Sequence, residues 1–302
     1  MTPILHHYPT SPFAELVRMA LGLKGLAWQS VTIPRIAPKP DLAALTGGYI
    51  RTPVLQIGAD IYCDTAAILA ALEGFAPTPS YYPAPLGALH VMIANWAAGP
   101  QFRAHVGAAM GAMPEGALDG AFVADRKARF GLDLGQLGKA APQLAAQTRV
   151  AALWLSQTLT DGRAFIGGEA PGHGDLALAA NIWFVRSVPF AKANAEALTG
   201  LPHVADWFGR MAALGHGTPT EISAAEAIDI ARAATPSDVA GGIEAPFSHG
   251  QMVRIQTEGS GDAPVEGALL KADSTGITLS RTDPRAGAVH VHFPRIGQFI
   301  IA

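Results

Sequence analysis

The stretch RTPVLQIGADIYCDTAAILAALE, residues 51–73, carries most of the information about the fold. Two short runs rich in apolar and β-branched residues, Pro53–Ile57 and Asp60–Cys63, flank a Gly-Ala pair, which is typical of a β-hairpin. Apolar residues then recur at helical spacing over Thr65–Leu72, and Asp64 or Thr65 can cap the start of that helix. The stretch therefore predicts a strand, a turn, a strand and a helix.

The residues before this stretch add a strand, a helix and a second strand. Ile4–Tyr8 and Trp28–Ile33 favour strands, and the apolar spacing between them predicts a helix over Phe13–Gly25. A proline-rich loop and a short helix over Asp41–Leu45 follow. In this β-α-β-(α)-β-β-α order, Pro53 resembles the cis-proline that opens the third strand of thioredoxin-like folds. Taken alone, it is an ordinary edge-strand proline.

Two further zones follow the first 75 residues or so. Residues 86–235 are rich in Ala and Leu, and their periodic segments are separated by Gly and Pro, which predicts an all-α domain. Residues 245–302 change to the period of short strands. We expect strands at Met252–Thr257, Val265–Lys271, Gly276–Arg281, Ala288–Phe293 and Gln298–Ile301. They predict a small all-β domain, a closed barrel of the SH3 or Sm-like kind.

The composition excludes several classes of protein. The 302 residues are 49% hydrophobic and only 15% charged, which argues against disorder and indicates a large core or subunit interface. The net charge of −3 offers no bulk attraction for nucleic acid or an anionic membrane. Residues 74–102 have no charged side chain, but prolines interrupt them, so we expect no membrane span. One cysteine and the lack of an evident signal peptide favour a reducing, cytoplasmic setting.

Two pairs of polar residues stand where helices begin. Thr10 and Ser11 lie at the first strand-to-helix turn, where a hydroxyl and the helix dipole can stabilise an anion such as a thiolate. Asp64 and Thr65 begin a later helix, where they can hold an ammonium and a carboxylate group together. Each pair also has a plain structural explanation, because Ser, Thr and Asp are the usual N-cap residues.

These motifs together resemble one enzyme family. YPTSPF (residues 8–13) followed by VRMAL (17–21) looks like the start of glutathione transferases that use a serine. TPVLQIG (52–58) and DTAAILAALE (64–73) resemble that family's glutathione-site segment. The resemblance is close over the first 75 residues or so and extends through the helical zone. It implies a thioredoxin-like domain at 1–75 and a helical domain at 86–235, with 245–302 as an addition.

The resemblance also assigns roles to residues. Ser11 would donate its hydroxyl to the glutathione sulfur, with Thr10 as the rival. Six residues would bind glutathione: Thr52 and the presumed cis-proline Pro53 at the cysteinyl part, Asp64 and Thr65 at the γ-glutamyl end, and Arg51 or Lys39 at the glycyl carboxylate. The family usually has Glu in place of Asp64. It also usually has a capping hydroxyl three residues before Asp175, where this chain has Gly172.

The apolar electrophile would lie against the first helices of the second domain. The candidate residues are Phe13, Met92, Trp96, Phe102, His105 and Met110. Met and aromatic side chains suit adaptable apolar binding, although for any one of them plain core or dimer packing is the more common explanation. The charge-free segment containing Met92 and Trp96 predicts a homodimer in which a partner or the substrate covers that segment.

The remaining reactive side chains favour structural roles. The first turn lacks the cysteine found in family members that exchange disulfides, and Cys63 beside Asp64 reads as a buried structural thiol. His6 and His7 alternate faces. His290 and His292 share a face, yet no third ligand is evident, so we expect no metal.

The predicted function is that of a glutathione transferase. Glutathione is the co-substrate, and its thiolate, stabilised by Ser11, attacks an apolar electrophile. The alternative is a non-catalytic scaffold of the same fold whose C-terminal β domain binds a partner or ligand.

Overall fold

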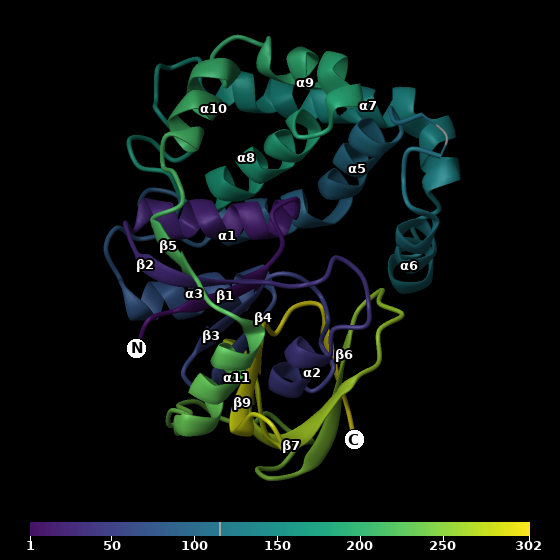
Figure 1. The fold of residues 1–302 in the computed structure, drawn as a ribbon. Coiled ribbons are helices and arrows are strands. Elements are labelled where there is room, and N and C mark those ends of the chain that lie inside the picture. Colours follow the sequence, from purple (N-terminus) through teal and green to yellow (C-terminus); the bar gives the residue numbers. More distant parts are fainter. Residues whose placement is uncertain (115) are drawn as a thin grey trace. The chain divides into compact units, whose positions relative to one another are not determined.

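A computed structural model describes residues 1–114 and 116–302. These residues form two compact units (Figure 1). The sheet unit comprises Met1–Pro9, Ala27–Gly74 and Thr218–Ala302, and the helical unit comprises Thr10–Leu26 and Phe75–Gly217. The C-terminal strands therefore share a compact unit with the N-terminal strands.

The sheet unit is built on one ten-stranded sheet of order β10-β6-β7-β8-β9-β4-β3-β1-β2-β5. The strands are β1 (Ile4–His7), β2 (Ala27–Thr32), β3 (Val54–Ile57), β4 (Asp60–Cys63), β5 (Thr218–Glu221), β6 (Met252–Thr257), β7 (Val265–Asp273), β8 (Gly276–Asp283), β9 (Gly287–Phe293) and β10 (Gln298–Ile301). The unit also contains helices α2 (Pro40–Thr46) and α11 (Ala224–Ala233), and α3 (Thr65–Phe75) begins in it. The expected thioredoxin-like strand order and the C-terminal sheet region are confirmed.

The C-terminal strands continue the N-terminal sheet. β9 runs parallel to β4, and His290 pairs with Asp60 and His292 with Tyr62. In the described part of the chain β10 pairs with β6 only, so the expected closure of residues 245–302 into a barrel is not seen. Instead, β9 covers the edge of unpaired backbone groups that the β3–β4 hairpin leaves on β4, so the C-terminal strands extend the N-terminal sheet.

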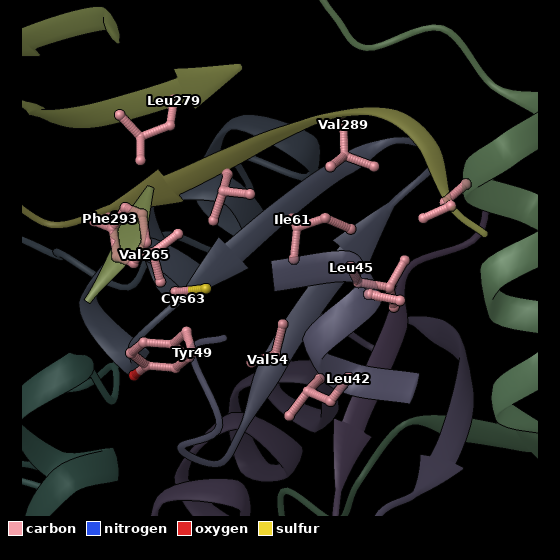
Figure 2. Close-up of a cluster of buried hydrophobic side chains, with 14 of the residues drawn as sticks. Leu42, Leu45, Tyr49, Val54, Ile61, Cys63, Val265, Leu279, Val289 and Phe293 are labelled. Carbon is pink, nitrogen blue, oxygen red and sulfur yellow. The ribbon is translucent and has the colours of Figure 1, made fainter. Parts of the chain in front are cut away.

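The core of the sheet unit spans this junction. Ile61 and Cys63 of β4 and Val289 of β9 are completely buried, and Phe293 and Leu279 belong to the same cluster (Figure 2). The N-terminal and C-terminal strands thus share one core. This shared core buries part of the large hydrophobic fraction of the sequence.

The helical unit contains α1 (Pro12–Leu23), α4 (Leu89–Trp96), α5 (Phe102–Met110), α6 (Gly120–Phe130), α7 (Leu134–Thr158), α8 (His173–Arg186), α9 (Lys192–Thr199) and α10 (Val204–Ala212). α8 contacts α1, α4 and α5 and is the central helix of the unit. The expected helical middle is confirmed. Within the described residues, no helix is both long and apolar enough to cross a membrane.

The start of α8 explains why this chain has Gly172 where the family has a hydroxyl. Asp175 is fully buried and accepts hydrogen bonds from the backbone N–H groups of Ile166 (2.9 Å) and Gly172 (3.0 Å). The Nδ1 atom of His90 lies 3.3 Å from the N–H of Gly174 and accepts from it. A histidine from α4 therefore supplies the acceptor that a Ser or Thr cap would supply.

Candidate functional site

The candidate glutathione residues gather at one end of the β3–β4 hairpin. Val54 pairs with Cys63 as the last pair at that end. Residues 51–53 precede β3 and Asp64 and Thr65 follow β4, so this register places the two segments side by side. The hairpin predicted from the sequence is thus the element that assembles this part of the site.

Thr52 lies just outside the ladder and precedes a cis peptide bond to Pro53, as expected. The Lys39 ammonium donates a hydrogen bond to Thr52 Oγ1 at 3.1 Å. Lys39 itself is only 4% exposed. Over residues 1–114 and 116–302 the backbone N–H and C=O of Thr52 have no hydrogen-bond partner. Thr52 therefore offers one backbone donor and one acceptor to a peptide-like ligand.

Asp64 caps α3 in an unusual conformation. Its φ of 81° lies in the left-handed region, which few residues other than glycine adopt. Asp64 Oδ1 accepts the N–H of Ala66 at 3.0 Å. Burial raises the pKa of Asp64, while the bond from Ala66 and the charge of Arg51 oppose that rise. Asp64 is half-buried, and a partly desolvated carboxylate gains from an additional cation, so it is suited to an ammonium group.

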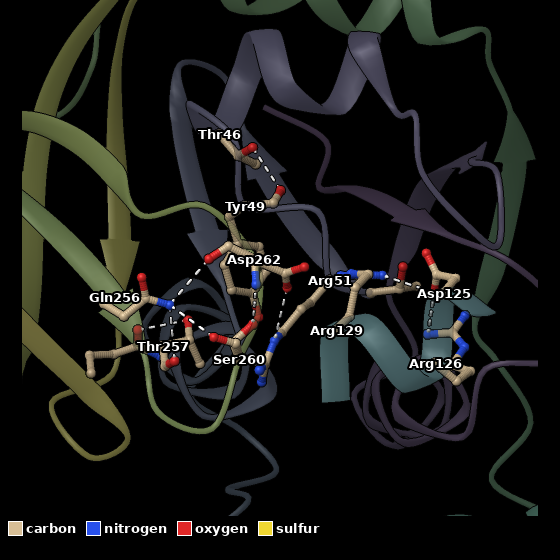
Figure 3. Close-up of polar contacts among 12 residues, drawn as sticks. Thr46, Tyr49, Arg51, Asp125, Arg126, Arg129, Gln256, Thr257, Ser260 and Asp262 are labelled. Carbon is tan, nitrogen blue, oxygen red and sulfur yellow. Dashed lines mark hydrogen bonds and ion pairs between the residues drawn. The ribbon is translucent and has the colours of Figure 1, made fainter. Parts of the chain in front are cut away.

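Arg51 forms an ion pair that the sequence did not predict. Its Nε atom lies 3.5 Å from Asp262 Oδ2, in the loop between β6 and β7 (Figure 3). The sequence shows this loop only as a turn-forming Gly-Ser-Gly-Asp segment, residues 259–262. Nothing in that segment points to Arg51, because the pairing depends on how the C-terminal strands join the sheet.

Ser11 belongs to the helical unit and is the N-cap of α1. It is 2% exposed, and its Oγ accepts the N–H of Ala14 at 3.2 Å. The capping role that the sequence left open is therefore real. It does not use the hydroxyl proton, and the structure shows no acceptor for that proton among the described residues. Thr10, the rival, is exposed.

Some of the electrophile candidates are in contact and others are not. The rings of Phe13 and Phe102 lie 4.6 Å apart. Trp96 instead lies beside Trp154 of α7, with ring centres 6.0 Å apart. Phe13 and Phe102 are thus the only pair among these candidates for which the described residues show a ring contact.

The other three electrophile candidates differ in exposure. Met92 is 67% exposed on α4, whereas Met110 is half-buried at the end of α5. His105 is buried, and its Nδ1 lies 2.8 Å from the carbonyl oxygen of Gln101. Burial lowers the pKa of His105 to about 4. Its environment is therefore that of a neutral, structurally bonded histidine.

Cys63 is completely buried at the end of β4. Burial raises its pKa, and the neighbouring charge of Asp64 raises it further. Because the thiolate is the reactive form, this thiol is inert in the folded protein. The prediction of a structural cysteine is confirmed.

The histidines of the strands bond within the sheet unit. His6 pairs with Gln56 at 2.9 Å, and His7 with Ser30 at 3.0 Å. In the part of the chain that the structure describes, no group of three His, Cys, Asp or Glu side chains is arranged to hold a metal ion.

His290 and His292 face a carboxylate that the sequence analysis did not connect with them. His292 Nε2 lies 2.9 Å from Asp60 Oδ1, and His290 Nδ1 lies 3.8 Å from the same atom. Burial acts to raise the pKa of Asp60, but hydrogen bonds from His292 and from the N–H of Ser237 lower it overall. The cluster ties β4 to β9.

Comparisons with known proteins support the resemblance seen in the sequence. Residues 5–80 match the N-terminal domain of glutathione S-transferases. A GST-like protein from Pseudomonas syringae is 38% identical, covers 99% of this chain and 98% of its own, and has a TM-score of 0.83. A search of curated proteins finds no match.

Two more distant structures share the fold. A glutathione transferase family member from Pseudomonas fluorescens, solved with two glutathione bound, is 13% identical with a TM-score of 0.54, and the match covers 70% of this chain and 88% of that one. A transferase from Methylobacterium radiotolerans, solved with glutathione sulfonate, is 21% identical with a TM-score of 0.50, covering 74% and 98%.

The near-complete match at 38% identity places the chain in the glutathione S-transferase family. It is a glutathione-transferase-like enzyme of unspecified substrate.

Proposed function

We propose that this protein is a glutathione-dependent transferase in which the thiolate of bound glutathione attacks an apolar electrophile. The observation that carries the proposal is the end of the β3–β4 hairpin. There the backbone N–H and C=O of Thr52, which have no hydrogen-bond partner among the described residues, stand beside the half-buried carboxylate of Asp64. Glutathione is a peptide with a free ammonium group, so these groups match its cysteinyl backbone and its γ-glutamyl end.

Each residue of the hairpin end then has a chemical task. Thr52 binds the cysteinyl N–H and C=O in the manner of a neighbouring strand. Asp64 binds the ammonium, and Thr65 with the first N–H groups of α3 binds the γ-glutamyl carboxylate. Lys39 and Arg51 supply positive charge for the glycyl carboxylate.

Ser11 stabilises the thiolate in this proposal. Its buried hydroxyl is fixed by the bond from Ala14 and donates its own proton to the sulfur. The partial positive charge at the start of α1 adds to this effect and lowers the thiol pKa. The thiol proton passes to solvent, and a sulfur lone pair forms the new S–C bond. A leaving group departs with its electron pair, or in an addition the adjacent atom takes a proton from water.

The apolar residues Phe13 and Phe102, with Met92, Trp96, His105 and Met110, are proposed to form the electrophile side of the site. Support comes from the ring contact between Phe13 and Phe102. The electrophile is defined only by class, as an apolar molecule with a carbon open to attack by a thiolate.

Exposed apolar side chains support a homodimer. Met92 is 67% exposed and Leu89 49% exposed on the charge-free helix α4, and Trp154 is 57% exposed on α7. Burying such residues against a second copy removes apolar area from water. We further propose a cytoplasmic setting and no metal requirement. Light scattering of the protein and of a Met92→Glu variant tests the dimer, because the variant should dissociate.

The central experiment measures glutathione binding, thiolate absorbance and conjugation of apolar electrophiles for the wild type, Ser11→Ala and Thr10→Ala. We expect Ser11→Ala to bind glutathione but to lose the thiolate signal and at least about tenfold in rate, since one charge-assisted hydrogen bond is worth this much. Thr10→Ala should keep both. Unchanged conjugation by Ser11→Ala would overturn the role of Ser11. Tight glutathione binding without a thiolate in the wild type would favour the scaffold alternative.

A further inference from the structure

Arg51 lies near two carboxylates. Its Nε forms the 3.5 Å ion pair with Asp262, and its charge also acts on Asp64, whose pKa it lowers. The pKa of the buried Tyr49 is raised by burial. The charges of Asp64 and Asp262 raise it further, and the charge of Arg51 lowers it. The guanidinium of Arg51 therefore pairs with Asp262, and its charge also acts on Asp64 at the same end of the hairpin.

The loop that carries Asp262 is fixed by its own hydrogen bonds. Gln256 Nε2 donates to the carbonyl oxygens of Ser260 (3.3 Å) and Asp262 (3.2 Å), and the N–H of Asp262 donates to Ser260 Oγ at 3.1 Å (Figure 3). The Asp262 side chain is 10% exposed. These hydrogen bonds fix the backbone of the loop at Asp262 before any ligand arrives, which limits where its carboxylate can lie and favours pairing with Arg51.

We propose that Asp262 is a positioning residue that holds Arg51 away from Asp64 and so keeps the Asp64 carboxylate available for the ammonium group of the ligand. An Arg51–Asp64 pair would compete directly with that ammonium, because both cations need the same oxygens. The inference rests on the proposed glutathione function and deepens it. The C-terminal strands would then determine selectivity for peptides that keep a free α-ammonium.

The test compares two ligands: glutathione, and an analogue of glutathione that lacks only the α-amino group. The ratio of their dissociation constants reports the Asp64–ammonium contact and is insensitive to a general loss of stability. In Asp262→Asn we expect this ratio to fall about tenfold, since a competing charge-assisted bond is worth about that much. Asp262→Glu, which keeps the charge, should retain the ratio.

Two controls separate the proposed role from other effects. Glu258→Gln removes the same charge from an exposed position of the same loop and should leave the ratio unchanged. In the double variant Arg51→Gln/Asp262→Asn, the ratio should return to the wild-type value, because no guanidinium remains to occupy Asp64.

The outcomes are distinct. A ratio unchanged by Asp262→Asn, with glutathione still bound, would overturn this inference and leave the proposed function standing. Failure of the double variant to restore the ratio would overturn the competition between Arg51 and the ammonium. Absence of glutathione binding by the wild type would overturn the proposed function together with the inference.

Discussion

Replacing Gly172 by serine should destabilise the protein, although serine is the better helix cap. A Cβ at Gly172 would lie 2.4 Å from His90 Cε1, 2.5 Å from its Nε2 and 2.6 Å from its Nδ1. The His90 ring is fully buried and cannot retreat into solvent. The backbone at Gly172, with φ −128° and ψ −176°, is open to any residue, so the cost arises from the His90 ring and not from backbone strain.

The magnitude follows from two opposing effects. Overpacking a buried site costs about 1–3 kcal/mol, whereas serine improves on glycine at an N-cap by only roughly a few tenths of a kcal/mol. Gly172→Ser should therefore lower the free energy of unfolding by about 1–3 kcal/mol. In a His90→Ala background, the clash is gone and the new hydroxyl can replace the lost acceptor for the Gly174 N–H. There the same substitution should be neutral or stabilising.

Urea unfolding of the four proteins of this double-mutant cycle at pH 7.5 is the assay. The coupling free energy should exceed about 1 kcal/mol, well above the few tenths expected for independent sites. The reasoning is refuted if Gly172→Ser has the same cost with and without His90. Equal urea m-values across the cycle would show that only the native state has changed.

Three further predictions concern stability and reactivity. Burial lowers to about 4 the pKa of three histidines, His6, His105 and His173. Between pH 6.5 and 4 the unfolded chain binds more protons at these histidines than the folded chain does. Lowering the pH from 7 to 5 should therefore reduce the free energy of unfolding by at most about 2 kcal/mol per histidine. A urea midpoint that does not change over this pH range would contradict the prediction. Cys63 should react with a thiol reagent only after unfolding, and rapid stoichiometric labelling of the native protein would count against its burial. Gly47→Ala should destabilise the protein more than Gly25→Ala. Both glycines have a positive φ, but only at Gly47 would a Cβ meet a side chain, the Arg281 guanidinium at 2.4 Å. Equal losses of thermal stability in the two variants would show that this contact does not matter.

Local patterns of the sequence predicted the thioredoxin-like strands, because each signal lies within a few residues. The hairpin follows from a Gly-Ala pair between two apolar runs, and the cap at Asp64 follows from its place before a helical run. The candidate glutathione residues at the end of the hairpin were assigned through the resemblance to the family rather than from these local patterns. The register of the hairpin then places the segments that hold Thr52 and Asp64 side by side.

Long-range pairing is where the sequence was insufficient. The alternation of apolar and polar residues predicted the strands of residues 245–302, but it did not predict that β9 pairs with β4. Alternation determines which face of a strand is buried and not which strand lies beside it. The same limit concealed Asp60 as the partner of His292, which is 232 residues away. It also concealed His90 as the acceptor at the start of α8, where only a missing hydroxyl was visible.

The pairing of β4 with β9 links the core, the end of the β3–β4 hairpin and the loop that carries Asp262. β4 carries Cys63 into the shared core and is followed by Asp64, and its other edge receives β9. Pairing along that edge fixes the register of the whole C-terminal ladder, and with it the position of the β6–β7 loop that carries Asp262. The C-terminal strands therefore share one sheet and one core with the N-terminal strands, and their β6–β7 loop brings Asp262 to Arg51.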